Sequence, residues 1–127
     1  MKKISCVALI CVAIASANCS STPAKPSQVV IKYYQLVDKG DFEAAFKLLS
    51  KKQINGQGGP NFAKGLVVLE VGAIHDNGGM KSVQIMKENV FGNSAEITAK
   101  LFLGNGKSDE MDLKLSKEDN EWKIDEM

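Results

Sequence analysis

Residues 95–101, Ala-Glu-Ile-Thr-Ala-Lys-Leu, indicate the fold class of this 127-residue chain most clearly. Small or apolar residues alternate with polar ones at every step. A period of two places the two kinds on opposite faces of a β-strand. One face is therefore predicted to be buried and the other solvated, as in an antiparallel sheet that is covered on one side only.

The same alternation returns in the residues that follow. Gly-Asn-Gly at 104–106 predicts a turn, and 111–115 predicts the next strand. A second turn at 117–120 leads into a short last strand at 122–124. These segments predict an antiparallel meander in which each strand pairs with the one before it.

The upstream segments predict more strands. The apolar, β-branched run 66–74 and the segment 81–91 both have strand character, and the intervening 75–79 contains the Asn-Gly signature of a hairpin turn. Before them, the glycine content of 55–60 predicts a loop, and a turn of helix is expected at 61–64. The sheet is therefore expected to have four or five strands.

The N-terminal part of the domain predicts two helices. Apolar residues recur at three- and four-residue spacing over 27–39 and again over 42–52. Gly40 is expected to end the first helix, and Asp41 to cap the second by accepting hydrogen bonds from its first N–H groups. Helices followed by strands predict an α+β fold, with two helices packed on a curved antiparallel sheet and a concavity between them.

Three stretches carry a resemblance to known proteins: 29–34 (VVIKYY), 39–45 (KGDFEAA) and 121–124 (EWKI). In this order and spacing the chain resembles the nuclear-transport-factor-like superfamily, whose fold is a cystatin-like cone. More narrowly, it resembles a bacterial lipoprotein family called domain of unknown function 4878, described as lumazine-binding-like. The resemblance implies a single α+β domain over 27–127, and it implies neither a catalytic motif nor a particular ligand.

Residues 1–18 have the layout of a secretory signal. Two lysines precede an apolar run of about a dozen residues, and small residues follow. A helix of that length rises about 18 Å, which is short of the roughly 30 Å hydrocarbon core of a membrane. We therefore expect a signal peptide over 1–18 and export of the chain.

Cys19 is the candidate lipidation site. The other two cysteines lie inside the expected signal, so the processed chain would hold one thiol and no internal disulfide. The preceding residues resemble the lipobox of bacterial lipoproteins, although Ser16 and Asn18 depart from its commonest form. The resemblance implies a membrane anchor of acyl chains such as palmitate, followed by a tether over 19–26. It also implies a place in the cell envelope, with Ser20 favouring the outer membrane.

Charge and composition argue against nucleic-acid binding. The formal net charge is +1, from 16 basic and 15 acidic residues, and all 16 basic residues are lysine. Arginine supplies the planar, bidentate donor pair that reads phosphates and base edges. We therefore predict partners other than nucleic acid.

No residue pattern predicts a catalytic or metal site. His75 is the only histidine, whereas a metal site needs several converging ligands, so a surface histidine is expected. Asp76 is explained by the predicted turn, without an Asp–His dyad. The glycines of 56–59 lack the Lys-Ser/Thr tail of a phosphate-binding loop. Neither metal nor cofactor is predicted.

Aromatic residues are the candidate lining of the concavity. They are Tyr33, Tyr34, Phe46 and Trp122, although helical spacing also suits plain core positions. A buried tyrosine hydroxyl needs a hydrogen-bond partner, which favours the two tyrosines as pocket residues. The expected function is non-catalytic binding of a small hydrophobic molecule, a peptide or an envelope protein.

Two other functions stay open. The superfamily resemblance also implies an isomerase or dehydratase type of enzyme, which would need a buried ionisable group with a shifted pKa. Glu70 and Glu88 are the candidates, if either one is buried beside a hydroxyl such as that of Tyr34. The third function is a structural envelope protein whose concavity is filled by its own side chains.

Overall fold

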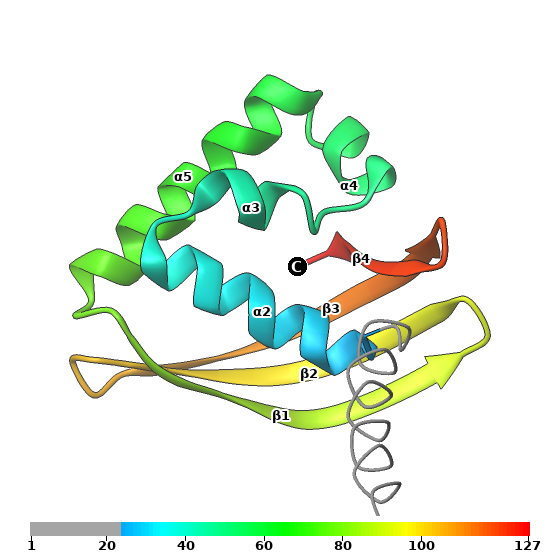
Figure 1. The fold of residues 1–127 in the computed structure, drawn as a ribbon. Coiled ribbons are helices and arrows are strands. Elements are labelled where there is room, and N and C mark those ends of the chain that lie inside the picture. The colour runs from blue at the N-terminus through cyan, green and yellow to red at the C-terminus, as the bar shows by residue number, and fades with distance from the viewer. Residues whose placement is uncertain (1–23) are drawn as a thin grey trace, which may run out of the picture.

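The computed structural model describes residues 24–127. The predicted signal peptide (1–18), Cys19 and most of the tether (19–26) lie outside the described residues. In the described part, four helices precede four strands (Figure 1). The elements are α2 (Pro26–Lys39), α3 (Phe42–Phe46), α4 (Lys51–Gly56), α5 (Pro60–Asp76), β1 (Met80–Phe91), β2 (Ser94–Leu103), β3 (Ser108–Glu118) and β4 (Glu121–Glu126).

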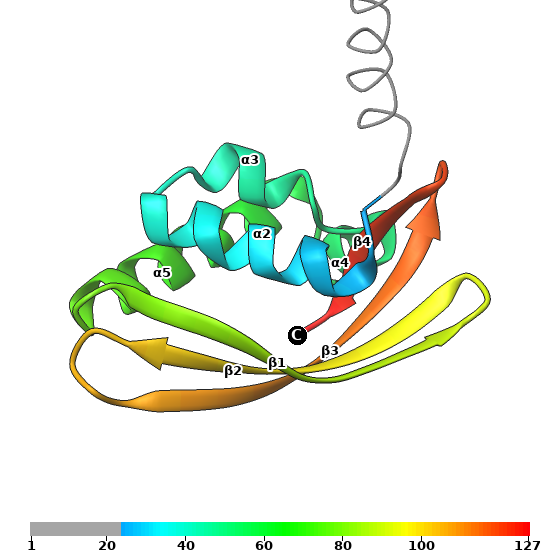
Figure 2. The ribbon, with the colours of Figure 1, turned by 60° about the horizontal axis from the view of Figure 1, so that its bottom comes forward.

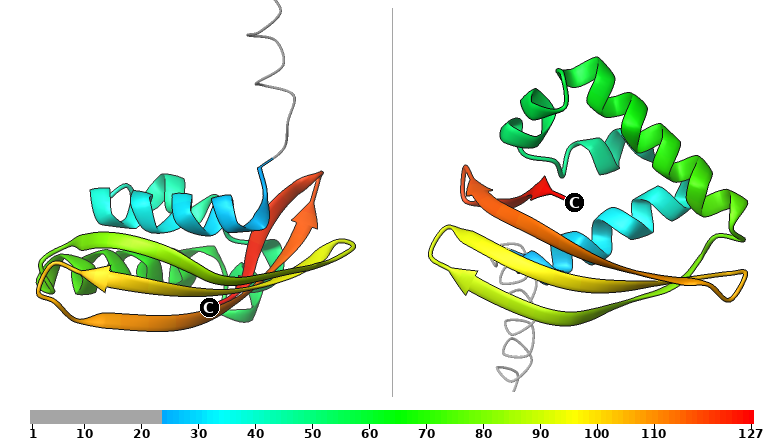
Figure 3. Two further views of the ribbon diagram at one scale, coloured as in Figure 1. Left: turned by 90° about the horizontal axis from the view of Figure 1, so that it is seen from below. Right: turned by 180° about the vertical axis from the view of Figure 1, so that it is seen from behind.

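The strands form one antiparallel sheet in the order β1-β2-β3-β4. Along β2 the alternation predicted from the sequence is present, since Ala95, Ile97, Ala99 and Leu101 are buried. The sheet curves, and all the helices lie on its concave side (Figures 2 and 3). The predicted α+β fold with helices on a curved antiparallel sheet is thus confirmed.

The helix α2 forms the centre of the concave side. Its buried face consists mainly of valines and tyrosines at helical spacing. The helix packs on β1, β2 and β4, and the Tyr34 hydroxyl reaches Met111 on β3. Gly40 ends α2 in the left-handed conformation (φ 80°), and the Asp41 carboxylate accepts the Ala44 N–H at 3.2 Å. Both predicted helix-end residues therefore have the predicted roles.

The prediction of a strand over 66–74 is wrong. These residues belong to α5, a 17-residue helix that begins at Pro60, a residue suited to the first helical turn. The buried positions of α5 are Ala63, Val67 and Ile74, which follow helical spacing. Its outer face is apolar too, with Leu69 68% exposed, so the run has no polar face to reveal its period. The sheet has four strands because this segment is absent from it.

The predicted helix over 42–52 is interrupted. Between α3 and α4 the chain is extended and lies beside β4. Two hydrogen bonds join them: the Ile124 N–H donates to the Leu48 carbonyl at 2.8 Å, and the Ser50 N–H donates to the Ile124 carbonyl at 2.9 Å. Ser50 then caps α4 through a 3.0 Å hydrogen bond from the Gln53 N–H to its hydroxyl. The predicted loop 55–60 is shorter than expected, because α4 reaches Gly56.

Candidate functional site

A cavity of about 180 Å³ opens between the helices and the end of the sheet. We call it the Tyr33–Glu70 pocket. Its wall combines α2, the extended segment before α4, α4 itself, α5 and the end of the chain after β4. The lining residues are Tyr33, Leu49, Gln53, Gln57, Leu66, Val67, Glu70 and Met127.

The centre of this pocket is a hydrogen bond between two helices. The Tyr33 hydroxyl on α2 donates to Glu70 Oε1 on α5 at 2.6 Å. Tyr33 is fully buried, and its ring meets that of Tyr34 edge to face with centroids 5.1 Å apart. A hydrogen bond contributes about 0.5–1.5 kcal/mol, or about 1.5–3 kcal/mol when one partner is charged, so this contact helps to hold α5 against α2.

Burial dominates the electrostatics of the pair. It raises the pKa of Glu70, and the hydrogen bond from Tyr33 opposes this with a smaller effect. The pKa of Tyr33 is raised by burial and then by the nearby Glu70 charge, and that of Tyr34 is raised by the same two causes. Both tyrosines therefore keep their protons at neutral pH, and Glu70 is the side chain in this pocket whose charge can change.

Two amide side chains, one on α4 and one directly after it, add polar atoms to the pocket. Gln53 and Gln57 both line it, and Gln57 Oε1 is buried without a hydrogen-bond partner in the described part of the chain. An unpaired buried acceptor costs about 1–3 kcal/mol. A ligand with a suitable donor would remove that cost.

The volume limits what the pocket can hold. A cavity of about 150 Å³ accommodates benzene, whereas sites for drug-sized ligands measure roughly 300–1,000 Å³. At about 180 Å³, the Tyr33–Glu70 pocket fits a small molecule or one side chain of a larger partner.

Replacing Glu70 by glutamine is expected to change the pH dependence of stability. Because burial raises the pKa of Glu70, the folded protein keeps this proton to higher pH than the unfolded chain does, whose glutamate pKa is about 4.3. The proton on Glu70 therefore contributes its full stabilisation at pH values below the pKa of the unfolded chain. This contribution to the wild-type free energy of unfolding is lost as pH rises through the pKa of the folded protein. Glutamine has no such proton, so the stability of Glu70→Gln relative to wild type should increase with pH.

Urea unfolding at about pH 4, 6 and 8 measures this difference. Glu110→Gln, which removes an exposed carboxylate of β3, controls for the loss of one negative charge. A difference between Glu70→Gln and wild type that stays constant over the three pH values would contradict the prediction.

The structure separates the four aromatic residues proposed from the sequence. Tyr33 forms part of the pocket wall, while the Tyr34 hydroxyl is directed at Met111 Sδ, 3.0 Å away. Phe46 is partly buried and borders a different hollow. Trp122 is 7% exposed and belongs to the core, with Lys117 Nζ 5.3 Å from its ring centroid. These four side chains do not converge on one site.

The other residues considered from the sequence lie away from the pocket. His75 and Asp76 are exposed at the end of α5, so the predicted turn begins only at Asn77. Glu88 is exposed on β1 and accepts the Ser27 N–H at 3.0 Å. The glycines of 56–59 connect α4 to α5, where they shape a tight junction between two helices.

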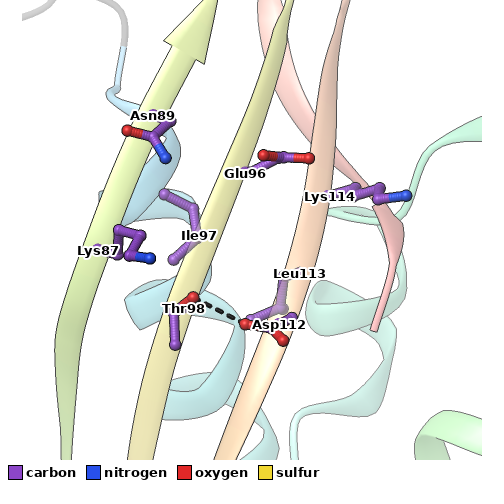
Figure 4. A pocket seen from close by; sticks show the side chains of 8 residues that line it. All are labelled: Lys87, Asn89, Glu96, Ile97, Thr98, Asp112, Leu113 and Lys114. Carbon is purple, nitrogen blue, oxygen red and sulfur yellow. Dashed lines mark hydrogen bonds between the residues drawn. The ribbon is translucent and has the colours of Figure 1, made fainter.

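A larger hollow of about 340 Å³ lies on the outer face of the sheet. Figure 4 shows its side chains on β1, β2 and β3, with the Thr98 hydroxyl donating to Asp112 Oδ1 at 2.7 Å. Positively charged lysines and negatively charged carboxylates surround it, among them Lys87, Glu96 and Lys114. Their charges offset one another, so this surface favours no single ligand charge.

A third hollow, of about 390 Å³, lies between α3, α4 and the turn after β3. Several of its polar groups already have partners within the protein. The Lys51 N–H donates to Glu118 at 2.9 Å, and Lys123 Nζ donates to the Lys47 carbonyl at 2.8 Å. The Tyr33–Glu70 pocket differs because it contains a partly buried carboxyl group and an acceptor, Gln57 Oε1, that has no partner among residues 24–127.

Sequence reasoning considered Glu70 but placed it on a strand, and it missed both glutamines. One signal could have located the carboxylate. Glu70 is the single charged residue in 66–74, and helical spacing puts it on the same face as Val67 and Ile74. The glutamines carry no comparable signal, because α4 is a short polar helix whose orientation depends on its neighbours.

Within residues 24–127, no group of three or more histidine, cysteine or acidic side chains is arranged to hold a metal. The helices of this part are all too short or too polar to cross a bilayer.

Comparison with known proteins identifies the fold. No family model and no curated protein matches the chain. Among solved structures, "Putative NTF2-like transpeptidase" from Campylobacter jejuni matches with a TM-score of 0.65 and 16% identity, over 80% of this chain and 97% of the other. A de novo designed protein with a curved β-sheet matches with a TM-score of 0.55 and 19% identity, over 80% and 95%. The chain therefore has an NTF2-like fold.

Proposed function

We propose that this NTF2-like domain is a non-catalytic binding module that holds a small ligand, or one side chain of a peptide or envelope partner, in the Tyr33–Glu70 pocket. The observation that carries the proposal is the pocket itself, which combines an apolar wall with a carboxylate and two amides. Mostly apolar pockets with a few directed polar groups are typical of ligand sites. A purely structural protein would have no need to leave this cavity unfilled.

We further propose that the domain is exported and attached to the cell envelope through a lipid on Cys19, with the outer membrane as its site. The support is the signal-like composition of 1–18 and the single thiol that would remain after processing. Two or more acyl chains give stable membrane attachment. The domain would then present its pocket to periplasmic or surface molecules.

An acid–base enzyme is the second candidate, and the Tyr33–Glu70 hydrogen bond is the observation that favours it. A partly buried glutamate with a raised pKa resembles a general base. Acid–base catalysis works best with groups whose pKa lies near the working pH, and burial raises the pKa of Tyr33, the other ionisable side chain of the pocket, far above that range. Reversible binding accounts for these lining residues without requiring a further catalytic group.

Small-molecule screening tests the binding proposal. The full chain, purified in detergent, is screened by thermal shift and native mass spectrometry against small amines, acids, alcohols and aromatic compounds. Leu66→Trp places a large ring in the pocket and should abolish binding of any ligand found. Leu69→Trp introduces the same ring one turn along α5 at an exposed position and should bind normally. Absence of any ligand, or equal binding by both variants, would refute the proposal.

Metabolic labelling with a palmitate analogue tests the anchor. Wild type should incorporate the label and fractionate with membranes, and Cys19→Ala should lose both properties. Equal labelling of the two proteins would rule the lipid anchor out.

A further inference from the structure

We propose that the ligand group recognised by the Tyr33–Glu70 pocket is a protonated amine, carried by a small free molecule or by a lysine side chain of a peptide. This inference rests on the binding function proposed above and names the chemistry of the ligand. Three features of the pocket lead to it: the free oxygen of Glu70, the unpaired oxygen of Gln57 and the balance of charge.

The Glu70 carboxylate has acceptor capacity left over. An ionised carboxylate accepts about four hydrogen bonds and donates none. The Tyr33 hydroxyl uses its one proton on Oε1, and Oε2 accepts no hydrogen bond from the described residues. Tyr33 is thereby a positioning residue, which orients the carboxylate and leaves its second oxygen for a ligand.

Gln57, the residue directly after α4, supplies a second acceptor from another part of the chain. It lines the same pocket, and its Oε1 atom is buried without a partner in the described part of the chain. A ligand that fits both atoms must donate at least two hydrogen bonds. An ammonium group has three N–H donors and no acceptor, so it matches this pair of acceptors.

The charge balance favours a cation over an anion. Glu70 is the one lining side chain that can become charged in the ordinary pH range, and its charged form is negative, since Tyr33 keeps its proton and neither lysine nor histidine lines the pocket. A carboxylate removed from water without a cationic partner is unfavourable, and a bound cation would supply that partner. An anionic ligand would meet repulsion from Glu70 in place of this compensation.

The remaining lining matches a short alkyl chain. Leu49, Leu66 and Val67 provide apolar walls, and the volume of about 180 Å³ suits a group near the size of benzene. An amine with four or five carbons therefore fits, whether it is free or the end of a lysine side chain.

Titration with three matched probes tests the inference. The full chain in detergent is titrated with n-butylammonium, with n-butanol as a neutral compound of equal length, and with tetramethylammonium as a cation without N–H donors. Binding is followed by NMR chemical shifts. A ligand of five non-hydrogen atoms reaches roughly micromolar affinity at best, so the titration extends to millimolar concentrations. We expect n-butylammonium to bind at least about tenfold more tightly than either control.

Substitutions locate the interaction. Glu70→Gln keeps the shape of the side chain and removes its charge, and we expect it to weaken n-butylammonium binding by at least about tenfold. Tyr33→Phe keeps the carboxyl group but removes the hydrogen bond that lowers its pKa, and it should weaken binding by a smaller factor. Glu110→Gln removes an exposed carboxylate and should bind as wild type does. NMR spectra of each variant establish that it is folded before the titration is interpreted.

The outcomes separate this inference from the proposed function. If n-butanol binds as tightly as n-butylammonium, or if Glu70→Gln binds the amine normally, the amine proposal is overturned. If a neutral or anionic compound binds in a manner blocked by Leu66→Trp, the binding function stands and the amine inference fails. A lysine derivative blocked at both ends, bound more tightly than n-butylammonium, would support a peptide as the source of the amine.

Discussion

Ile124→Ala is expected to lower the free energy of unfolding by about 2–5 kcal/mol, the range for truncating a fully buried isoleucine or leucine to alanine. Ile124 on β4 is 0% exposed and packs in the core between the sheet and α2. Its backbone N–H and carbonyl both form hydrogen bonds with the extended segment before α4. The cavity left by the substitution would therefore weaken the junction between the helices and the sheet.

Urea unfolding monitored by circular dichroism measures this loss. Ile124→Val removes one methylene group and should cost about 0.5–1.5 kcal/mol. Leu69→Ala truncates an exposed side chain of α5, 68% accessible to water, and should change stability by no more than about 0.5 kcal/mol. A loss below about 1 kcal/mol for Ile124→Ala would show that this residue is not central to the core.

Gly104→Ala is expected to cost about 3 kcal/mol, at the upper end of the range for overpacking, because the collision is with backbone atoms. A Cβ on Gly104 would overlap the Gly78 carbonyl oxygen and lie 2.7 Å from its carbon. The β2–β3 turn and the junction between α5 and β1 are also joined by a hydrogen bond, which the Gly104 N–H donates to the Gly79 carbonyl at 2.8 Å. The substitution should separate the β2–β3 turn from the junction between α5 and β1.

Gly72→Ala is the matched control for this substitution. Gly72 lies within α5, and a Cβ there would meet no atom within 4 Å. Alanine is about 0.8–1 kcal/mol more favourable than glycine inside a helix, so this variant should be more stable than wild type. Equal and small effects for Gly104→Ala and Gly72→Ala in urea unfolding would contradict the predicted contact between the turns.

The sequence predicted the sheet well because its signal is local. The alternation around Ile97 repeats every second residue, and a buried face on one side follows from it directly. The end of α2 and the start of α3 were equally predictable, since Gly40 and Asp41 act through their own backbone and side-chain chemistry. The segment 66–74 was assigned wrongly because residues on every face of α5 are apolar, which removes the period that distinguishes a helix from a strand.

The candidate pocket depended on contacts that no local pattern encodes. Tyr33 was predicted as a lining residue from its need for a partner, but the partner itself could not be identified. Glu70 lies 37 residues away along the chain, and it reaches Tyr33 only because α5 is a helix packed against α2. With 66–74 assigned to a strand, the sequence offered Glu70 only as one of two carboxylates that could meet a tyrosine hydroxyl, and it named Tyr34, whereas the observed partner is Tyr33.

The sequence by itself determined the α+β class, the first helix and the strands β1 to β4, since helical spacing, alternation and turn residues act over a few neighbouring positions. The tertiary structure alone decided that 66–74 is a helix, that residues 48–50 pair with β4, and that Tyr33, Glu70 and Gln57 share one pocket. The physical reason is that a buried charge and its hydrogen-bond partners are brought together by packing between elements distant in the chain, and packing is a property of the whole fold.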